Sequence, residues 1–174
     1  MGGGDRGWLL GRAVVEAGHA ARVVPSDASH AGAQGRAHPG ARAAAEQRKS
    51  KPHDPELFPA DPRRLATLRG ALERVTLACW LFGSASGSQE EVQAWHGDRL
   101  EAFVRQLLDS SARGFVYEAA GSVAPEVRAQ GARLAAETAA RHAMVLGLLE
   151  QDPADEAAWL EQARERTLAL VETA

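Results

Sequence analysis

Short apolar runs alternate along the chain with longer stretches in which apolar residues recur every three or four positions. The runs predict strands, because a short unbroken apolar run is typical of a strand buried on both faces of a parallel sheet. The longer stretches predict helices with one apolar face. Strands are predicted at about residues 19–24, 56–60, 75–82, 114–120 and 144–149.

Helices are predicted between these strands. Leu9, Leu10, Ala13, Val14 and Ala17 predict a helix over residues 8–17. Asp61 is a candidate N-cap for a helix that has Pro62 in its first turn and ends near Leu72. Further helices are predicted from about Gln89, over residues 98–108 and 125–141, and from about Asp155 to Val171.

Alternation of strands and helices predicts an α/β protein with a three-layer, Rossmann-like, doubly wound parallel sheet. A six-stranded sheet of this kind needs one strand more, before Gly2, and only Met1 stands there. The absent first strand would be central, between the strands at 19–24 and 75–82. We therefore expect that the natural protein starts upstream and that this chain is shortened at its N-terminus.

One domain is predicted over residues 1–174, interrupted by a low-complexity insert at about 26–54. The insert is rich in Gly, Ala, Ser and His and has almost no large apolar residue, so it cannot bury a core. Its histidines, His30, His38 and His53, are irregularly spaced and are interpreted as solvated loop residues, not metal ligands.

Composition narrows the function classes. The net charge of -3 argues against general nucleic-acid binding, which needs a basic face. No apolar run approaches the length of about 20 residues that a membrane span needs. A single cysteine, Cys79, excludes an internal disulfide and makes a cytoplasmic location the default expectation. No Cys/His spacing of a zinc site is present, and no metal is expected.

The first residues carry candidate chemistry. Gly2, Gly4 and Gly7 fit G-x-G-x-x-G, the turn that brings a backbone close to a pyrophosphate at a helix N-terminus. The alternative is a flexible glycine-rich start without a ligand. Arg6, inside the same segment, is interpreted either as a partner for a 2′-phosphate or as a solvated cation.

Four stretches together resemble the extended or atypical short-chain dehydrogenases, the family of NAD-dependent epimerases and dehydratases and their non-catalytic relatives. They are the glycine segment 2–7 with residues 16–19, the segment 58–62 with Leu65 and Leu72, the run 75–83, and residues 113–120. In this resemblance they correspond to the glycine turn, the third strand with its Asp near adenine, the fourth strand, and the fifth strand.

The resemblance implies a bound dinucleotide, NAD or NADP, and a set of residues that contact it. Pro25 stands where an NAD enzyme has its ribose-binding acid and Ser26 where an NADP enzyme often has Arg, so the choice of cofactor stays open. The implied cofactor contacts are Gly2, Gly4, Asp5, Arg6, Gly7, Ser26, Asp61, Gly83, Ser84 and Ala120.

The family's catalytic pair, Tyr-x-x-x-Lys, is missing. Lysine occurs only at Lys49 and Lys51, and the single tyrosine, Tyr117, is predicted to be a packed strand residue. We therefore expect no catalytic residue, and we favour a cofactor sensor or binding module over an NAD(P)-dependent oxidoreductase or epimerase. A homodimer is one arrangement that the sequence allows.

Two alternatives stay open. The first is a degenerate Rossmann scaffold that binds no nucleotide and acts through protein contacts. The second is an oxidoreductase or epimerase with a different proton donor, for which His96, beside Asp98, is the candidate. The favoured interpretation of His96 is a helix-start residue that faces the cleft at the strand ends, near a ligand.

Overall fold

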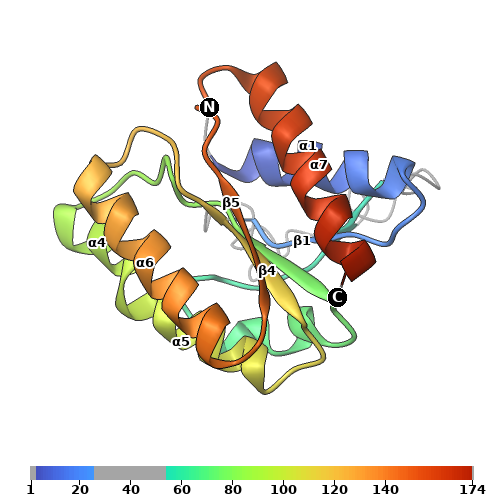
Figure 1. Ribbon diagram of the computed structural model, residues 1–174, viewed down its shortest axis with the longest axis horizontal. Coiled ribbons are helices and arrows are strands. Elements are labelled where there is room, and N and C mark those ends of the chain that lie inside the picture. Colours follow the sequence, from blue (N-terminus) through green and yellow to red (C-terminus); the bar gives the residue numbers. More distant parts are fainter. Residues whose placement is uncertain (1–2, 26–53, 174) are drawn as a thin grey trace, which may run out of the picture. The chain divides into compact units, whose positions relative to one another are not determined.

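The computed structural model describes residues 3–25 and 54–173, which form a mixed α/β protein (Figure 1). Their strands form two small parallel sheets, one of two strands and one of three. The structure therefore confirms the predicted α/β class and the predicted parallel pairing of the strands. The chain divides into two compact units, Met1–Ala71 and Leu72–Ala174. Nearly all of the predicted insert lies outside the described residues.

The first unit contains helix α1 (Gly3–Glu16), strand β1 (Arg22–Val23) and strand β2 (Glu56–Leu57). The two strands pair in parallel, with Arg22 opposite Glu56. Helix α1 starts five residues before the predicted start at Trp8, so the described part of the glycine segment is helical and the expected turn is corrected. Glycine allows either conformation, so the glycine pattern alone does not distinguish a turn from a helix.

Two glycines let α1 approach the strand. Leu10 and Val14 are buried on its apolar face. A Cβ atom at Gly11 would lie 3.0 Å from a Val23 methyl group, and one at Gly7 would lie 3.6 Å from Val23. The close packing at Gly11 leaves almost no room for a side chain.

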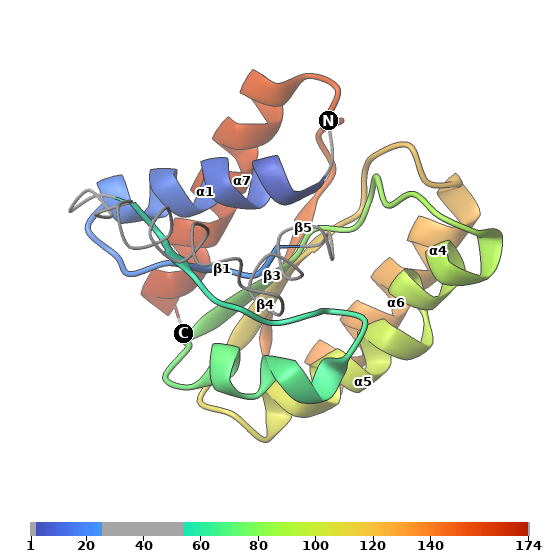
Figure 2. The same cartoon turned by 180° about the vertical axis from the view of Figure 1, so that it is seen from behind.

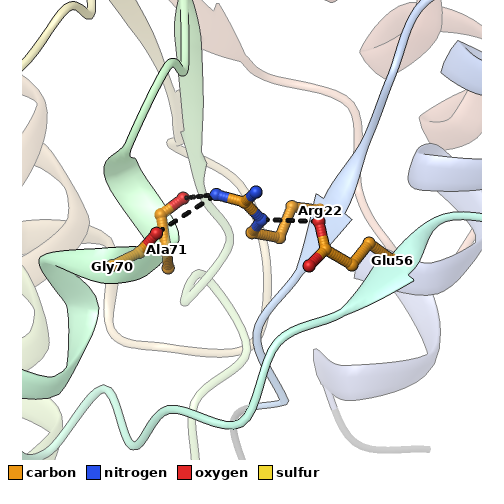
Figure 3. Close-up of polar contacts among 4 residues, drawn as sticks. All are labelled: Arg22, Glu56, Gly70 and Ala71. Atoms are coloured by element: carbon orange, nitrogen blue, oxygen red, sulfur yellow. Dashed lines mark hydrogen bonds and ion pairs between the residues drawn. The ribbon is translucent and has the colours of Figure 1, made fainter.

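Arg22 ties the segments of the first unit together (Figure 3). Its Nε donates to Glu56 Oε2 at 2.9 Å, and its Nη1 donates to the carbonyl oxygens of Gly70 at 3.2 Å and Ala71 at 2.8 Å. The guanidinium also lies 5.2 Å from the ring centroid of Phe58. One planar cation thus connects β1, β2 and the end of the unit through its fixed set of donors.

The predicted helix from Pro62 to Leu72 is wrong. The segment forms two short 3-10 helices, η1 (Leu65–Leu68) and η2 (Gly70–Leu72). Asp61 is not an N-cap of a helix that starts at Pro62; its side chain accepts the N–H of Arg63 in a local turn. The Thr67 hydroxyl accepts the N–H of Asp61 at 2.9 Å, and such local bonds compete with a regular helix.

The second unit is built on strands β3 (Leu77–Trp80), β4 (Gly114–Glu118) and β5 (Val145–Leu149). They pair in parallel in the order β3-β4-β5, with Ala78 opposite Phe115 and Phe115 opposite Leu146. Each confirms a predicted strand, although β3 and β4 are shorter than their apolar runs. Strand β4 is central, and all five of its residues are buried.

Helices cover both faces of this sheet (Figures 1 and 2). On one face lie α4 (Gln89–His96), α5 (Asp98–Leu108) and α6 (Pro125–Arg141), and on the other lies α7 (Glu156–Thr173). The predicted bounds of α5 and α6 are confirmed. Ser88 and Glu91 form a capping box that starts α4. Trp159 and Ala163 of α7 are fully buried.

An aromatic cluster fills the space between the end of β3 and the helices α4 and α5. The rings of Phe82 and Trp95 stack with centroids 4.2 Å apart, and those of Trp80 and Phe103 stack at 4.4 Å. Trp80 Nε1 donates to the Trp95 carbonyl oxygen at 2.9 Å. This packing fixes α4 and α5 beside the carboxyl end of β3.

The backbone conformation of Ala143, just after the C-terminus of α6, can be tested by substitution. The N–H of Met144 donates to Ala139 O at 3.0 Å, and Ala143 between them has φ of 53°, in the region that favours glycine. We expect Ala143→Gly to raise the free energy of unfolding by about 0.5 to 1 kcal/mol, because glycine adopts this conformation without steric cost. Urea denaturation measures the change.

Ala140→Gly is the matched control, since Ala140 is also exposed but lies inside α6. It should lower the free energy of unfolding by about 1 kcal/mol. Destabilisation by both substitutions would contradict the assignment of this helix end.

Candidate functional site

The carboxyl ends of β3 and β4 lie together at one edge of the three-stranded sheet, where ligands bind in open α/β folds. Two segments follow these strands, residues 82–84 and 119–123, and we call them the strand-end loops. Their backbones touch. A Cβ atom at Gly83 would overlap the carbonyl oxygen of Ala120, and one at Gly121, whose φ is 130°, would overlap the carbonyl oxygen of Gly83.

Hydrogen bonds join the two strand-end loops directly. The N–H of Val123 donates to Gly83 O at 3.0 Å, and the N–H of Ser122 donates to Ser84 Oγ at 3.3 Å. The N–H groups of Ala119 and Ala120 both donate to Leu149 O, at the end of β5. The loops therefore form one connected backbone surface along the edge of the sheet.

Two charged side chains hold this surface from inside. Glu118, fully buried at the end of β4, accepts the N–H of Gly83 through Oε2 at 2.7 Å. Arg128 of α6 donates through Nε to Val123 O at 2.8 Å and through Nη1 to Ala119 O at 2.5 Å. Bonds to charged groups are the stronger kind, and both are made to loop backbone.

His96 does not have its predicted position. It is the last residue of α4 and not a helix-start residue, and its side chain is 1% exposed. Its Nδ1 lies 2.5 Å from the Tyr117 hydroxyl and its Nε2 lies 3.1 Å from Phe82 O. Gly97 ends α4 and turns the chain, so His96 points into the unit and contacts the end of β3.

Burial keeps the His96–Tyr117 pair neutral. Loss of water around the imidazole lowers the pKa of His96 from its ordinary value of 6.5 to about 4, and the nearby Arg128 guanidinium lowers it further, while the bond to Phe82 O opposes the shift. Burial also raises the pKa of Tyr117 above its ordinary range. The Tyr117 hydroxyl has one proton and two acceptors within reach, Nδ1 of His96 and the carbonyl oxygen of Arg128.

Tyr117 is a packed strand residue, as predicted, and it is fully buried. Its hydroxyl lies 3.1 Å from Arg128 O, and a Cβ atom at Gly131 would overlap it. Neither His96 nor Tyr117 reaches solvent, and both side chains pack inside the second unit.

The predicted cofactor contacts fall into three groups. Gly83, Ser84 and Ala120 lie together in the strand-end loops; Gly83 and Ala120 are buried and Ser84 is half-buried. Gly4, Asp5, Arg6 and Gly7 lie in α1, and Asp61 lies in a turn, all in the first unit. Gly2 and Ser26 lie outside the described residues.

Sequence reasoning missed the groups that hold the strand-end loops. Glu118 is the only acidic residue in the apolar run 114–120, and this isolation was the available signal. Nothing in the local sequence marks Arg128, because it is one of several arginines on a polar helix. Burial raises the pKa of the Cys79 thiol to about 11.

Other features of the described residues offer no better candidate. A groove of about 290 Å³ lies beside α5 and α6, with Asp98, Glu101, Arg133 and Glu137 among its lining residues, and it contains none of the predicted contacts. Within residues 3–25 and 54–173, no three His, Cys, Asp or Glu side chains are grouped to hold a metal ion. None of the helices in that part of the chain is long and apolar enough to cross a membrane.

No family model, curated protein or solved structure matches this chain.

The pKa of His96 predicts a pH-dependent stability. Between about pH 6.5 and about pH 4 the unfolded chain binds a proton at this residue that the folded chain does not, so stability is lost as the pH falls through this window. We expect His96 to account for a loss of about 2 kcal/mol in the free energy of unfolding between about pH 7.5 and about pH 5. Chemical denaturation at the two pH values measures it.

The His96→Gln variant should be less stable at neutral pH. Its free energy of unfolding should no longer show the loss between about pH 7.5 and about pH 5 that His96 causes. His142→Gln is the matched control, because His142 is exposed, and it should keep the pH dependence of the original chain. An unchanged pH dependence in His96→Gln would contradict the buried neutral imidazole.

Proposed function

We propose that this protein is a dinucleotide-binding module with a Rossmann-like arrangement of the atypical short-chain dehydrogenase kind, without the family's catalysis. Its candidate contacts for NAD or NADP are the strand-end loops in the second unit and, taken separately, the helical glycine segment in the first unit. The observation that carries the proposal is the pairing of the strands.

The dinucleotide-binding fold has the strand order 3-2-1-4-5-6. If strand 1 is left out, two groups remain, 3-2 and 4-5-6, and all of their pairs are parallel. The chain pairs β1 with β2 and orders the other strands β3-β4-β5, also all in parallel. This agreement supports the Rossmann-like reading of the sequence.

The strand-end loops add chemical support. Residues 83–84 and 119–122 of these loops are all Gly, Ala or Ser, and Ser84 offers a hydroxyl that is half-buried. Because Ser84 Oγ accepts the N–H of Ser122, its proton is available to a ligand acceptor such as a ribose hydroxyl or a carboxamide oxygen.

A role in binding is favoured over catalysis by the burial of the titratable groups. Both nitrogens of His96 have partners, and Tyr117 is fully buried. A general acid must be within hydrogen-bond reach of the group that it protonates. The proposal therefore assigns neither residue to proton transfer.

One observation favours the second candidate, a scaffold that acts through protein contacts. The described glycines of the first segment lie in α1, and Gly7 and Gly11 lie close to Val23. In this reading the glycines serve helix packing and no pyrophosphate is bound.

Titration of the full chain with NADH and NADPH separates the two candidates. Energy transfer from tryptophan to nicotinamide reports binding, since Trp80 and Trp95 lie in the unit that carries the strand-end loops. The proposal predicts saturable binding, weakened by about tenfold or more in Gly4→Asp because a carboxylate repels the pyrophosphate.

An acidic residue in the first turn of α1 is compatible with the helix, so Gly4→Asp should stay folded. Ala20→Asp adds the same charge to the same unit outside the helix and should bind as the original chain does. Failure of both cofactors to bind the original chain would reject the dinucleotide proposal and leave the scaffold.

A further inference from the structure

Glu118 is a fully buried carboxylate at the end of the central strand, and core stability alone does not account for it. Removing a carboxylate from water is costly, and an apolar side chain of similar size would serve a core at least as well. Its Oε2 accepts the N–H of Gly83, the middle residue of the strand-end loop 82–84, whose backbone touches the other strand-end loop. The carboxylate therefore fixes a loop position at the edge of the sheet.

The surroundings of Gly83 leave little freedom for this loop. A Cβ atom there would lie 2.9 Å from Glu118 Cγ and would overlap the carbonyl oxygen of Ala120. The carbonyl oxygen of Gly83 accepts the N–H of Val123. The carbonyl oxygen of Val123 in turn accepts a hydrogen bond from Nε of Arg128. A continuous path of hydrogen bonds thus runs from Glu118 through both strand-end loops to Arg128.

We propose that Glu118 is a positioning residue, which with Arg128 holds the strand-end loops in one fixed shape so that Ser84 and Ser122 can contact a ligand. The part of this proposal that concerns the ligand rests on the proposed function. The fixed shape of the loops does not, and it can be measured in the protein without a ligand.

Amide hydrogen exchange of the full chain, measured by NMR on Glu118→Leu and Glu118→Gln, tests the proposal. In Glu118→Leu the amides of Gly83 and Val123 should exchange about tenfold or more faster, while those of Val116 and Leu148 inside the sheet keep their rates. Glu118→Gln should largely restore the slow rates, because its amide oxygen can accept the same N–H. Glu126→Leu is the matched control, since Glu126 is exposed in the first turn of α6.

The same variants are titrated with NADH and with NADPH. If the original chain binds either cofactor, Glu118→Leu should bind that cofactor about tenfold more weakly and Glu118→Gln nearly as well as the original. If the original chain binds neither cofactor, the proposed function fails, and the exchange rates still decide whether Glu118 positions the loops.

Three results would overturn the positioning role: unchanged exchange at Gly83 in Glu118→Leu, a uniform acceleration over β3, β4 and β5, or equal damage in Glu118→Leu and Glu118→Gln. If Glu118→Leu does not fold, Arg128→Met takes its place. That substitution removes the donors to Ala119 O and Val123 O and should accelerate exchange at Val123 without affecting Leu148.

Discussion

Strand β4 is hydrogen-bonded to a neighbour on each side and buried on both faces, and the second unit depends on this arrangement. Its register fixes β3 and β5, and its residues contact the helices on either face. A strand in this position admits almost no polar side chain unless that side chain has a partner. Tyr117 and Glu118 are the two exceptions, and both have hydrogen bonds to groups that come from other segments.

These two residues connect the core to the edge of the sheet. Tyr117 meets His96 at the end of α4, and His96 in turn contacts Phe82 at the end of β3. Glu118 meets Gly83 one residue further along. The position of the first strand-end loop is thus fixed by adjacent residues of the central strand.

The first unit uses a cation for a similar purpose. Strands of two residues each make few ladder bonds, and Arg22 adds a bond to Glu56 and two bonds to the carbonyl oxygens of Gly70 and Ala71. The close contact of Gly11 with Val23 supplies the apolar part of the packing. Both units therefore combine a small parallel sheet with a charged side chain that binds backbone carbonyl or N–H groups.

An element can be predicted from the sequence when residues close together in the chain determine it, and not when contacts between distant residues do. The bounds of α6 could be predicted because Pro125 at its start and the apolar run after it are local signals. The start of α1 could not, since its glycines fit a turn and a helix equally well. The 3-10 segments depend on the bonds between Asp61 and Thr67, and the position of His96 depends on the turn at Gly97 and on Tyr117, 21 residues away.

The same reason limits prediction of the site. Small residues after apolar runs predict Gly83, Ser84 and Ala120, which the structure brings together. Glu118 and Arg128 act on backbone groups of other segments, and neither their type nor their spacing indicates this. The one local signal is the isolation of Glu118 as the only acidic residue in the apolar run 114–120, and this signal marks the residue without indicating its partner.

We propose that the carboxyl ends of β3 and β4 form the ligand-binding edge of this protein. The most direct measurement is a map of backbone amide chemical shifts of the isotope-labelled full chain during addition of NADH and, separately, of NADPH. The proposal predicts that the largest changes fall on Gly83, Ser84 and residues 120–122, with little change at the opposite ends of the strands near Arg113 and Met144. Changes confined to those opposite ends, or no change with either cofactor, would contradict it.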